Sequence, residues 1–293
     1  MSASLRPLLT RLGPFVGLVL VITLFALPAE TREYFLTYNN FKIILTQTVI
    51  VAIAALGMTM IIISGGIDLS VGSSVALTSV VGALLIQHGW GPVPVLLTVV
   101  AAGGLIGLLN GAAIAGLRMT PFIITLGTLG VARGAAKWLA DNQTVNYDAS
   151  PINGWMTTAD PFSRALPVGV WVTVALALLT AVLLRDTLFG RHLFALGSNE
   201  TAARYSGVRI TRMKILGYTT AGCFFGLAGL FQLSRLRQGD PTVAVGLELD
   251  IIASVIIGGA SLNGGVGTVL GSMIGALIMS VLRSEWMSLH KEK

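Results

Sequence analysis

Long apolar runs separated by short polar segments follow one another along almost the whole chain. Runs near the roughly 20 residues that cross a bilayer predict about nine membrane-spanning helices, at residues 13–28, 42–63, 67–87, 93–117, 121–140, 167–184, 214–234, 249–260 and 266–283. The run at 93–117 is apolar on every face, whereas the strands of a membrane barrel alternate in polarity. The pattern therefore predicts an all-α, polytopic membrane bundle in which residues 1–293 form a single domain.

One segment, residues 185–214, departs from this pattern because it is mostly polar. Within it, Ser198 or Asn199 can cap a short helix, and Gly207 can end that helix. Glu200 lies near the positive end of the helix dipole, which favours its negative charge. A short, capped helix between two spans predicts a docking surface for a soluble partner rather than a solvated loop.

Composition and charge agree with a membrane protein and argue against other classes. The chain is 54% hydrophobic and 11% charged, whereas soluble domains carry about 25% charged residues. The net charge of +6 comes from basic residues that stand singly at the ends of spans. Positive-inside topology explains such residues, so we expect no nucleic-acid partner. The single Cys223 lies in an apolar run and defines no disulfide framework.

The distribution of charge orients the predicted spans. With the N-terminus inside, counting spans places residues 185–214 inside, where six Lys and Arg residues accompany two acidic residues, and places the loop at 141–166 outside. The first run resembles a signal peptide, but further spans follow it, so an uncleaved first helix is favoured. Other segments predicted to lie outside carry basic residues, contrary to the positive-inside rule, namely Arg32, Lys42, Arg235 and Arg237.

Two segments that contain paired glycines resemble each other. Ile61 to Ser70 reads I-I-I-S-G-G-I-D-L-S, and Ser254 to Asn263 reads S-V-I-I-G-G-A-S-L-N. In transporters, helices interrupted by glycine often meet near the substrate path, although a chance match between glycine-rich helices is the alternative. The candidate path residues on these segments are Gly65, Gly66, Asp68, Ser70 and Asn263.

Polar side chains within or beside the spans have two possible roles. A carboxylate such as Asp68 is costly in a membrane and is a candidate for function. Asp68 or Ser70 can instead cap the helix that follows the glycine break, and the two roles can coexist. The Asn110 amide either joins two helices or contacts a solute on the path. Glu248 and Asp250 are expected at the wet membrane surface near a helix start, with a role on the path as the alternative.

Glycines also recur every four residues, at 103, 107 and 111 and again at 267, 271 and 275. This spacing places small residues on one helix face and predicts close approach of backbones, within or between subunits. The pattern predicts packing and carries no information about a substrate.

The residues offer no arrangement for catalysis. The histidines at 88, 192 and 290 lie outside the predicted spans, so neither a Ser-His pair nor a helical metal pair can form inside the bundle. No G-x-x-x-x-G-K-[ST] phosphate loop occurs, so we expect this chain not to hydrolyse ATP. We therefore assign no catalytic residue, no metal and no cofactor to it.

Several motifs in a fixed order along the chain resemble one family. They are G-G-I-D-L-S-V-G at 65–72, P-F-I-I-T-L-G at 121–127, A-L-G-S-N-E at 195–200 with S-G-V at 206–208, and E-L-D at 248–250 followed by G-G-A-S-L-N-G-G at 258–265. Over nearly its whole length, the chain resembles the permease subunits of ribose-type ABC sugar importers. That group lies within the superfamily of monosaccharide and branched-chain amino acid permeases.

The resemblance implies a permease of the bacterial inner membrane that moves a monosaccharide by alternating access and has a cytoplasmic N-terminus. It implies three kinds of partner: a second copy or a paralogue, two cytoplasmic ATPase subunits that hold ATP and Mg²⁺, and a periplasmic or lipid-anchored sugar-binding protein. Residues 185–214 would supply the coupling helix. The expected ATPase contacts are Gly197, Asn199, Glu200, Arg204 and Gly207.

Family members usually continue past the equivalent of Leu282 with a further apolar span, so we expect either a truncation after about residue 283 or a last span that re-enters the membrane. An ion-coupled secondary transporter that uses Asp68 is the alternative function. An intramembrane enzyme built on Asp68 and Asp250 is a third possibility, without a recognisable local signature.

Overall fold

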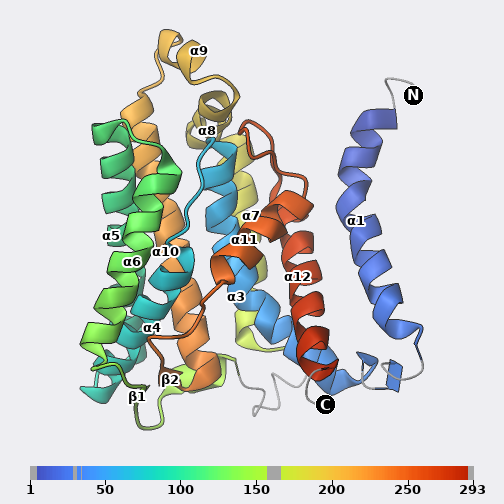
Figure 1. Cartoon of the computed structure of the whole chain (residues 1–293), viewed down its shortest axis with the longest axis vertical. Coiled ribbons are helices and arrows are strands. Elements are labelled where there is room, and N and C mark those ends of the chain that lie inside the picture. The colour runs from blue at the N-terminus through green and yellow to red at the C-terminus, as the bar shows by residue number, and fades with distance from the viewer. Residues whose placement is uncertain (1–4, 29–31, 34, 157–165, 290–293) are drawn as a thin grey trace.

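The computed structural model describes residues 5–28, 32–33, 35–156 and 166–289 and is a bundle of long helices that run roughly along one axis (Figure 1). The long helices are α1 (Leu5–Ala26), α3 (Tyr38–Ile63), α4 (Val71–Gln87), α5 (Pro92–Leu117), α6 (Pro121–Leu139), α7 (Val168–Asp186), α10 (Ile210–Leu236) and α12 (Val269–Leu289). Shorter elements are the 3-10 helix η1 (Pro151–Trp155) and helices α8 (Leu188–Ser198), α9 (Glu200–Tyr205) and α11 (Leu247–Ile257). Strands β1 (Val145–Asn146) and β2 (Gln238–Gly239) form a small antiparallel pair. The predicted helical bundle is confirmed, while residues 157–165 of the predicted outer loop lie outside the described residues.

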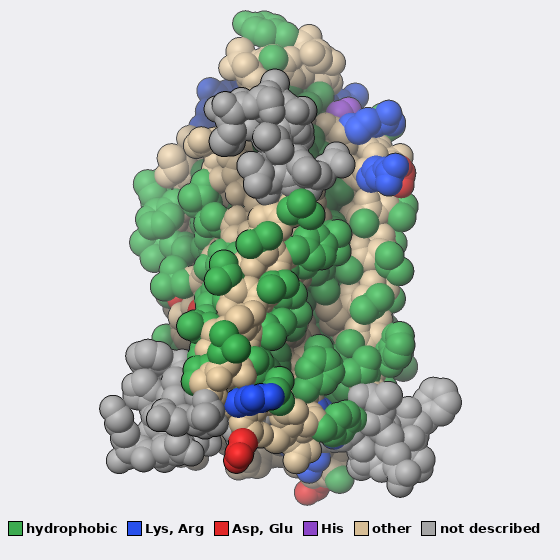
Figure 2. All heavy atoms as spheres, turned by 90° about the vertical axis from the view of Figure 1, so that its right-hand side faces the viewer, with side chains coloured by type: hydrophobic (Ala, Val, Ile, Leu, Met, Phe, Trp, Pro, Cys, Tyr) green, Lys and Arg blue, Asp and Glu red, His purple; other side chains and the backbone are tan. Residues whose placement is uncertain are grey.

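Among the described residues, four helices are both long and apolar enough to cross a membrane: α3, α5, α7 and α10. Shorter apolar helical stretches lie in α1, α4 and α12. Proline begins α5 and α6, where its missing N–H removes no helical hydrogen bond. Figure 2 shows hydrophobic side chains over the middle of one face and charged side chains near both ends, as lipid contact requires.

The predicted span at 249–260 forms only α11, which has 11 residues. At 1.5 Å per residue this helix is about 16 Å long, roughly half of the ~30 Å hydrocarbon core. The irregular segments on either side of α11, at 240–246 and 258–268, therefore have to complete any crossing. Similarly, the start of the predicted span at 67–87 is a loop, and α4 begins only at Val71. Both glycine pairs thus interrupt helices, as predicted.

The ends of the bundle carry different elements. Helix α1 begins at the same end as α8 and α9, whereas α12 finishes near the opposite end (Figure 1). This arrangement agrees with the predicted count of spans, which puts the N-terminus and the polar segment on one side of the membrane. Below, the end that carries α8 and α9 is called the coupling end.

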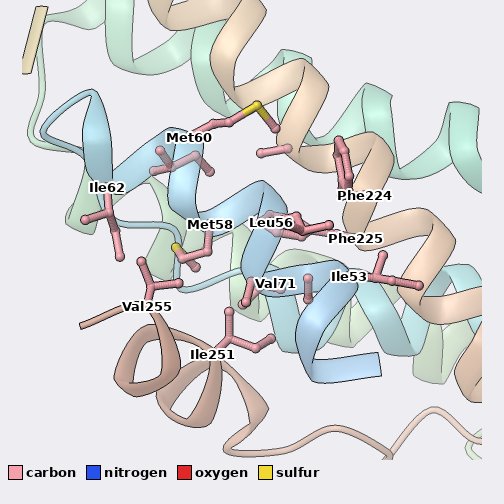
Figure 3. Packing of buried hydrophobic residues seen from close by; sticks show 14 of the residues in the cluster. Ile53, Leu56, Met58, Met60, Ile62, Val71, Phe224, Phe225, Ile251 and Val255 are labelled. Atoms are coloured by element: carbon pink, nitrogen blue, oxygen red, sulfur yellow. The ribbon is translucent and has the colours of Figure 1, made fainter. Parts of the chain in front are cut away.

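Helix α3 forms the centre of the bundle. It packs against α7, α10, α11 and α12, and 94% of its most apolar stretch is buried. A helix that is apolar on all faces is typically surrounded by other helices in this way. Figure 3 shows this packing, in which Leu56 and Met58 of α3 lie among residues of α10 and α11 that include Phe224, Phe225, Ile251 and Val255.

Helices α5 and α10 approach closely through glycines. A Cβ atom at Gly103 would overlap the carbonyl oxygen of Gly222, and one at Gly107 would overlap that of Tyr218. The second predicted stripe packs α12 on α11, where Gly275 lies against the Ser254 carbonyl. The predicted close approach of backbones is therefore found within the subunit.

We expect Gly107→Ala to lower the apparent melting temperature of the detergent-solubilised protein, because the added methyl overpacks the α5–α10 contact by about 1–3 kcal/mol. The matched control is Gly116→Ala in the same helix, where a Cβ meets no atom within 4 Å. Both variants gain the same helix propensity, so the difference between them isolates the contact. Equal melting temperatures of the two variants would contradict the packing described here.

Candidate functional site

The first helix break begins where α3 ends, at Gly65 and Gly66. Gly65 has a φ of +81°, a left-handed conformation that glycine adopts without strain. The Gly66 N–H donates to the Ile61 carbonyl at 3.0 Å, and the Gly65 N–H donates to the Ile62 carbonyl at 2.9 Å. These are the two bonds of a Schellman motif, so the break is a well-formed helix end.

A buried polar cluster of Asp68, Ser70, Asn110 and Thr128 follows the first break. Asp68, Ser70 and Asn110 are at most 1% exposed. One Asp68 carboxylate oxygen accepts from the Ser70 N–H at 2.8 Å and from the Ser70 hydroxyl at 2.6 Å, and the other accepts from the Asn110 amide at 3.2 Å. Thr128 of α6 donates to the Asn110 oxygen at 2.6 Å. The cluster thus joins the break to α5 and α6. The predicted capping of α4 is not found: Ser70 is the N-cap residue and makes no side-chain capping hydrogen bond, and Asp68 accepts the Ser70 N–H rather than an N–H within the helix.

The second break, at the end of α11, has similar local geometry. Gly259 has a φ of +91°, and the Ala260 N–H donates to the carbonyl five residues back at 3.1 Å. The Asn263 N–H donates to the Ser261 hydroxyl at 3.2 Å, the counterpart of the bond accepted by Asp68 in the first break. The resemblance between the two segments therefore extends to their hydrogen bonds. Asn263 itself is exposed and lies outside the polar cluster.

The two breaks meet against α8. The Gly265 N–H donates to the Ile63 carbonyl at 2.9 Å, which joins the second break to the end of α3. A Cβ at Gly197 of α8 would overlap the Ile63 carbonyl oxygen and would lie 2.7 Å from the Gly265 nitrogen. A Cβ at Gly264 would lie 2.9 Å from the Cα atoms of Gly65 and Gly197. We call Gly65, Gly197, Gly264 and Gly265 the glycine junction.

The polar segment forms two helices, α8 and α9, rather than the one short helix expected. They meet at Asn199, which ends α8 and caps α9 by accepting the Ala202 N–H at 2.9 Å. Gly207 follows α9 with a φ of +84°, the conformation of a glycine that ends a helix. The capped helix was predictable from its local signals. Helix α8 was missed because its residues were assigned to the segment that connects the capped helix to the preceding span.

Ion pairs orient α9 on the start of α10. The Glu200 carboxylate accepts from Lys214 at 2.8 Å and from Arg204 at 3.0 Å. The hydrogen bond from Lys214 lowers the pKa of Glu200 below its ordinary value, so the carboxylate is charged at neutral pH. Exposed pairs of this kind contribute at most about 1 kcal/mol each, so orientation is their main effect.

A cleft of about 860 Å³ lies beside α9, between residues of α5 and α10. Tyr205, at the end of α9, is 87% exposed. Figure 2 shows hydrophobic atoms at the apex of the coupling end and Lys and Arg side chains below them. Exposed aromatic surface beside a basic cleft is typical of a docking site. The charged residues that line the cleft are Arg118, Glu200, Arg204, Arg209, Arg212 and Lys214.

The structure brings together some predicted residues and separates others. Asp68, Ser70 and Asn110 share the polar cluster. The Asp250 carboxylate pairs with Arg283 of α12 instead, so the Asp68–Asp250 pair considered for an intramembrane enzyme is not formed. Tyr205 was not identified from the sequence as an exposed contact residue, because a lone tyrosine in a polar segment gives no signal of the exposure of its side chain.

Comparison with known proteins agrees with these features. A family model described as "Branched-chain amino acid transport system / permease component" matches residues 40–290. The chain is 36% identical over 271 residues to the ribose import permease protein RbsC of Escherichia coli K12, covering 92% of this chain and 84% of that protein. It is 38% identical over 280 residues to RbsC of Bacillus subtilis, covering 94% and 84%. It is 35% identical to the galactose/methyl galactoside import permease protein MglC of Haemophilus influenzae, covering 85% and 79%. No solved structure matches the chain.

An apolar bundle with interrupted helices and a capped polar unit at one end defines an integral membrane transport subunit. The chain belongs to the family of transport-system permease components, because the family model matches most of its length. The resemblance to ribose-type ABC sugar permeases is confirmed. As a member of this family it is a transport component rather than an enzyme.

Removing the Asn110 amide should destabilise the first break. In Asn110→Leu, one buried Asp68 carboxylate oxygen loses its hydrogen-bond partner, while the half-buried Thr128 hydroxyl keeps its bond to the Ile124 carbonyl. Each buried polar group left unsatisfied costs about 1–3 kcal/mol, so the apparent melting temperature in detergent should fall. Asn39→Leu, at an exposed position of α3, serves as the control and should melt like the wild type. A stable Asn110→Leu variant would show that the cluster does not hold the break.

Proposed function

We propose that this chain is the membrane-spanning subunit of an ATP-driven importer that moves a monosaccharide across the bacterial inner membrane. Support comes from the relatives, which are named as import permeases for ribose and for galactose and methyl galactoside. In this proposal the subunit pairs with a second copy or a paralogue. Two ATPase subunits bind ATP and Mg²⁺, and a separate binding protein delivers the sugar.

The proposed orientation has the coupling end and the N-terminus in the cytoplasm. The cleft beside α9 supports this orientation, since five of its charged lining residues are basic and one is acidic. Lys and Arg concentrate on the cytoplasmic side of membrane proteins. The pair of strands β1 and β2 then lies on the outer side, because Figure 1 shows it at the other end.

The unit formed by α8 and α9 is the observation that carries the proposal. It projects from the bundle at the coupling end, and it is stiffened by the Asn199 cap and by the pairs that Glu200 makes (Figure 1). We propose that α9 docks on an ATPase subunit through Asn199, Glu200, Arg204 and Gly207. Tyr205 is proposed as the apolar anchor of that contact.

Transmission into the membrane is proposed to run through α8. Gly197, which sequence reasoning assigned to the ATPase contact, lies against Ile63 and Gly265 instead. A displacement of α8 therefore acts on both helix breaks at once. In this proposal, Asp68, Ser70 and Asn110 preserve the local conformation of the first break while the break is displaced. Gly66 and Asn263 lie at the breaks and do not contact the sugar.

The proposed anchor is tested by Tyr205→Ala. Loss of a central aromatic anchor typically costs 2 kcal/mol or more, so the affinity for the ATPase subunit should fall by roughly 30-fold. The affinity is measured by titrating the purified ATPase subunit onto the permease in nanodiscs. Trp90→Ala changes an aromatic residue that is 48% exposed beyond the end of α4, away from the coupling end, and should bind like the wild type. Unchanged affinity in Tyr205→Ala would remove Tyr205 from the interface.

The proposed transmission is tested by Gly197→Ala. The methyl group overlaps the end of α3, so α8 must shift away from the breaks. The reconstituted complex should still hydrolyse ATP, while sugar uptake per ATP falls about 10-fold, since overpacking of about 1–3 kcal/mol acts on the link. Gly217→Ala of α10 adds a methyl at an ordinary 3.4 Å contact and should leave the ratio unchanged. Wild-type coupling in Gly197→Ala would exclude this route.

A further inference from the structure

Another cavity lies toward the end of the bundle opposite α8 and α9. Gln47 near the start of α3 and Gln232 near the finish of α10 line it, and Figure 1 shows these helix ends away from the coupling end. Its volume is about 190 Å³. Because one water needs at least about 10–15 Å³ of such volume, the cavity has room for several water molecules. The remaining polar residues that line it are Arg235, Asp250, Ser280 and Arg283.

The two glutamines are the unusual feature of this cavity. Each is 7% exposed, so each side chain is more than nine-tenths buried. Within the described part of the chain, neither side-chain amide makes a hydrogen bond, although both line the cavity. Within that part of the chain, the Ser74 hydroxyl is the only buried polar side-chain atom without a partner, so the two glutamine amides have access to the open cavity and can hydrogen-bond to water or to a polar solute there.

The charged lining of the cavity adds donors and acceptors around the glutamines. Arg283 of α12 donates to the Asp250 carboxylate, so this pair carries little net charge. Arg235 of α10 lies on the same cavity. Ionisable residues in membrane helices typically face the bundle interior or a water-filled path. Of the basic residues that break the positive-inside pattern, Arg235 therefore has a local reason for its position.

The two glutamines differ in their hydrogen bonding from the polar cluster at the first break. This difference distinguishes side chains that maintain the fold from side chains that are available to bind a solute. Asp68 and Asn110 satisfy each other and their neighbours, so they offer little to a passing molecule. Gln47 and Gln232 remain able to donate and accept at once. A sugar hydroxyl also donates and accepts at once, which is why amide side chains suit polyhydroxylated ligands.

We infer that Gln47 and Gln232, beside the Asp250–Arg283 pair, form a hydrogen-bonding site for the hydroxyls of a neutral monosaccharide on the outer side of the path. The inference rests on the proposed import function. It moves the solute contacts away from the glycine-interrupted segments, where sequence reasoning put most of them, and favours for Asp250 the path role that sequence reasoning held only as the alternative.

The test uses the complete transporter, with its ATPase subunits and sugar-binding protein, reconstituted in vesicles. Gln47→Met and Gln232→Met keep the side-chain length and remove the amide. The kcat/KM for ATP-driven uptake of D-ribose should fall about 2- to 10-fold in each variant, the range for one lost neutral hydrogen bond. ATPase activity stimulated by the loaded binding protein should stay within about twofold of the wild type. Gln87→Met, at an exposed position of α4, is the matched control.

A monodeoxyribose series supplies a readout that a purely structural effect would not change. For at least one of these probes, the sugar already lacks the hydroxyl that the amide contacts, so the variant and the wild type should transport it equally. Uptake of D-ribose at the wild-type rate in both Met variants, or an equal loss for every probe, would overturn the site. If a Met variant does not assemble with the ATPase, the shorter Gln→Asn variant is judged by the same outcomes. A wild-type transporter that moves neither ribose, galactose nor arabinose would overturn the monosaccharide function itself.

Discussion

Inside a bilayer, each backbone N–H and C=O group must find its partner within the protein, and this requirement governs the arrangement described here. An unbroken helix meets the requirement locally, but the helix ends at Ile63 of α3 and at Gly258 after α11 are buried, so their backbone groups need partners from elsewhere in the protein. The Ile63 carbonyl at the end of α3 accepts from Gly265, and the Ser70 N–H donates to Asp68. Each break is therefore satisfied by a segment that is distant in sequence or by a nearby buried carboxylate.

Satisfying the breaks in this way also links them mechanically. The first break is held to α5 and α6 by the polar cluster and to the second break by the glycine junction. Gly197 lies in that junction and belongs to α8, which continues into the exposed helix α9. Because packed backbones transmit displacement with little compression, this contact is the physical basis of the transmission route proposed above.

Polar groups inside the bundle fall into two kinds, and hydrogen-bond satisfaction distinguishes them. Asp68, Ser70 and Asn110 pair with one another and maintain the fold. Gln47 and Gln232 line a cavity without a hydrogen bond among the described residues and are available to a ligand. Hydrogen-bond satisfaction, rather than the type of side chain, therefore separates the two kinds, because the buried Asn110 amide is paired and structural whereas the glutamine amides are not paired.

The sequence by itself determined the helical membrane class, the approximate spans, the two glycine breaks, the capped helix after Asn199 and the family. Each of these depends on residues close together in the chain, whose hydropathy, capping or conformational preference acts locally. Only the tertiary structure decided that α11 stops halfway, that Asp68 pairs with Asn110, that Gly197 meets both breaks, and that Gln47 and Gln232 share a cavity. These features join residues that are far apart in the sequence, and their contacts arise from the packing of whole helices, which local patterns do not specify.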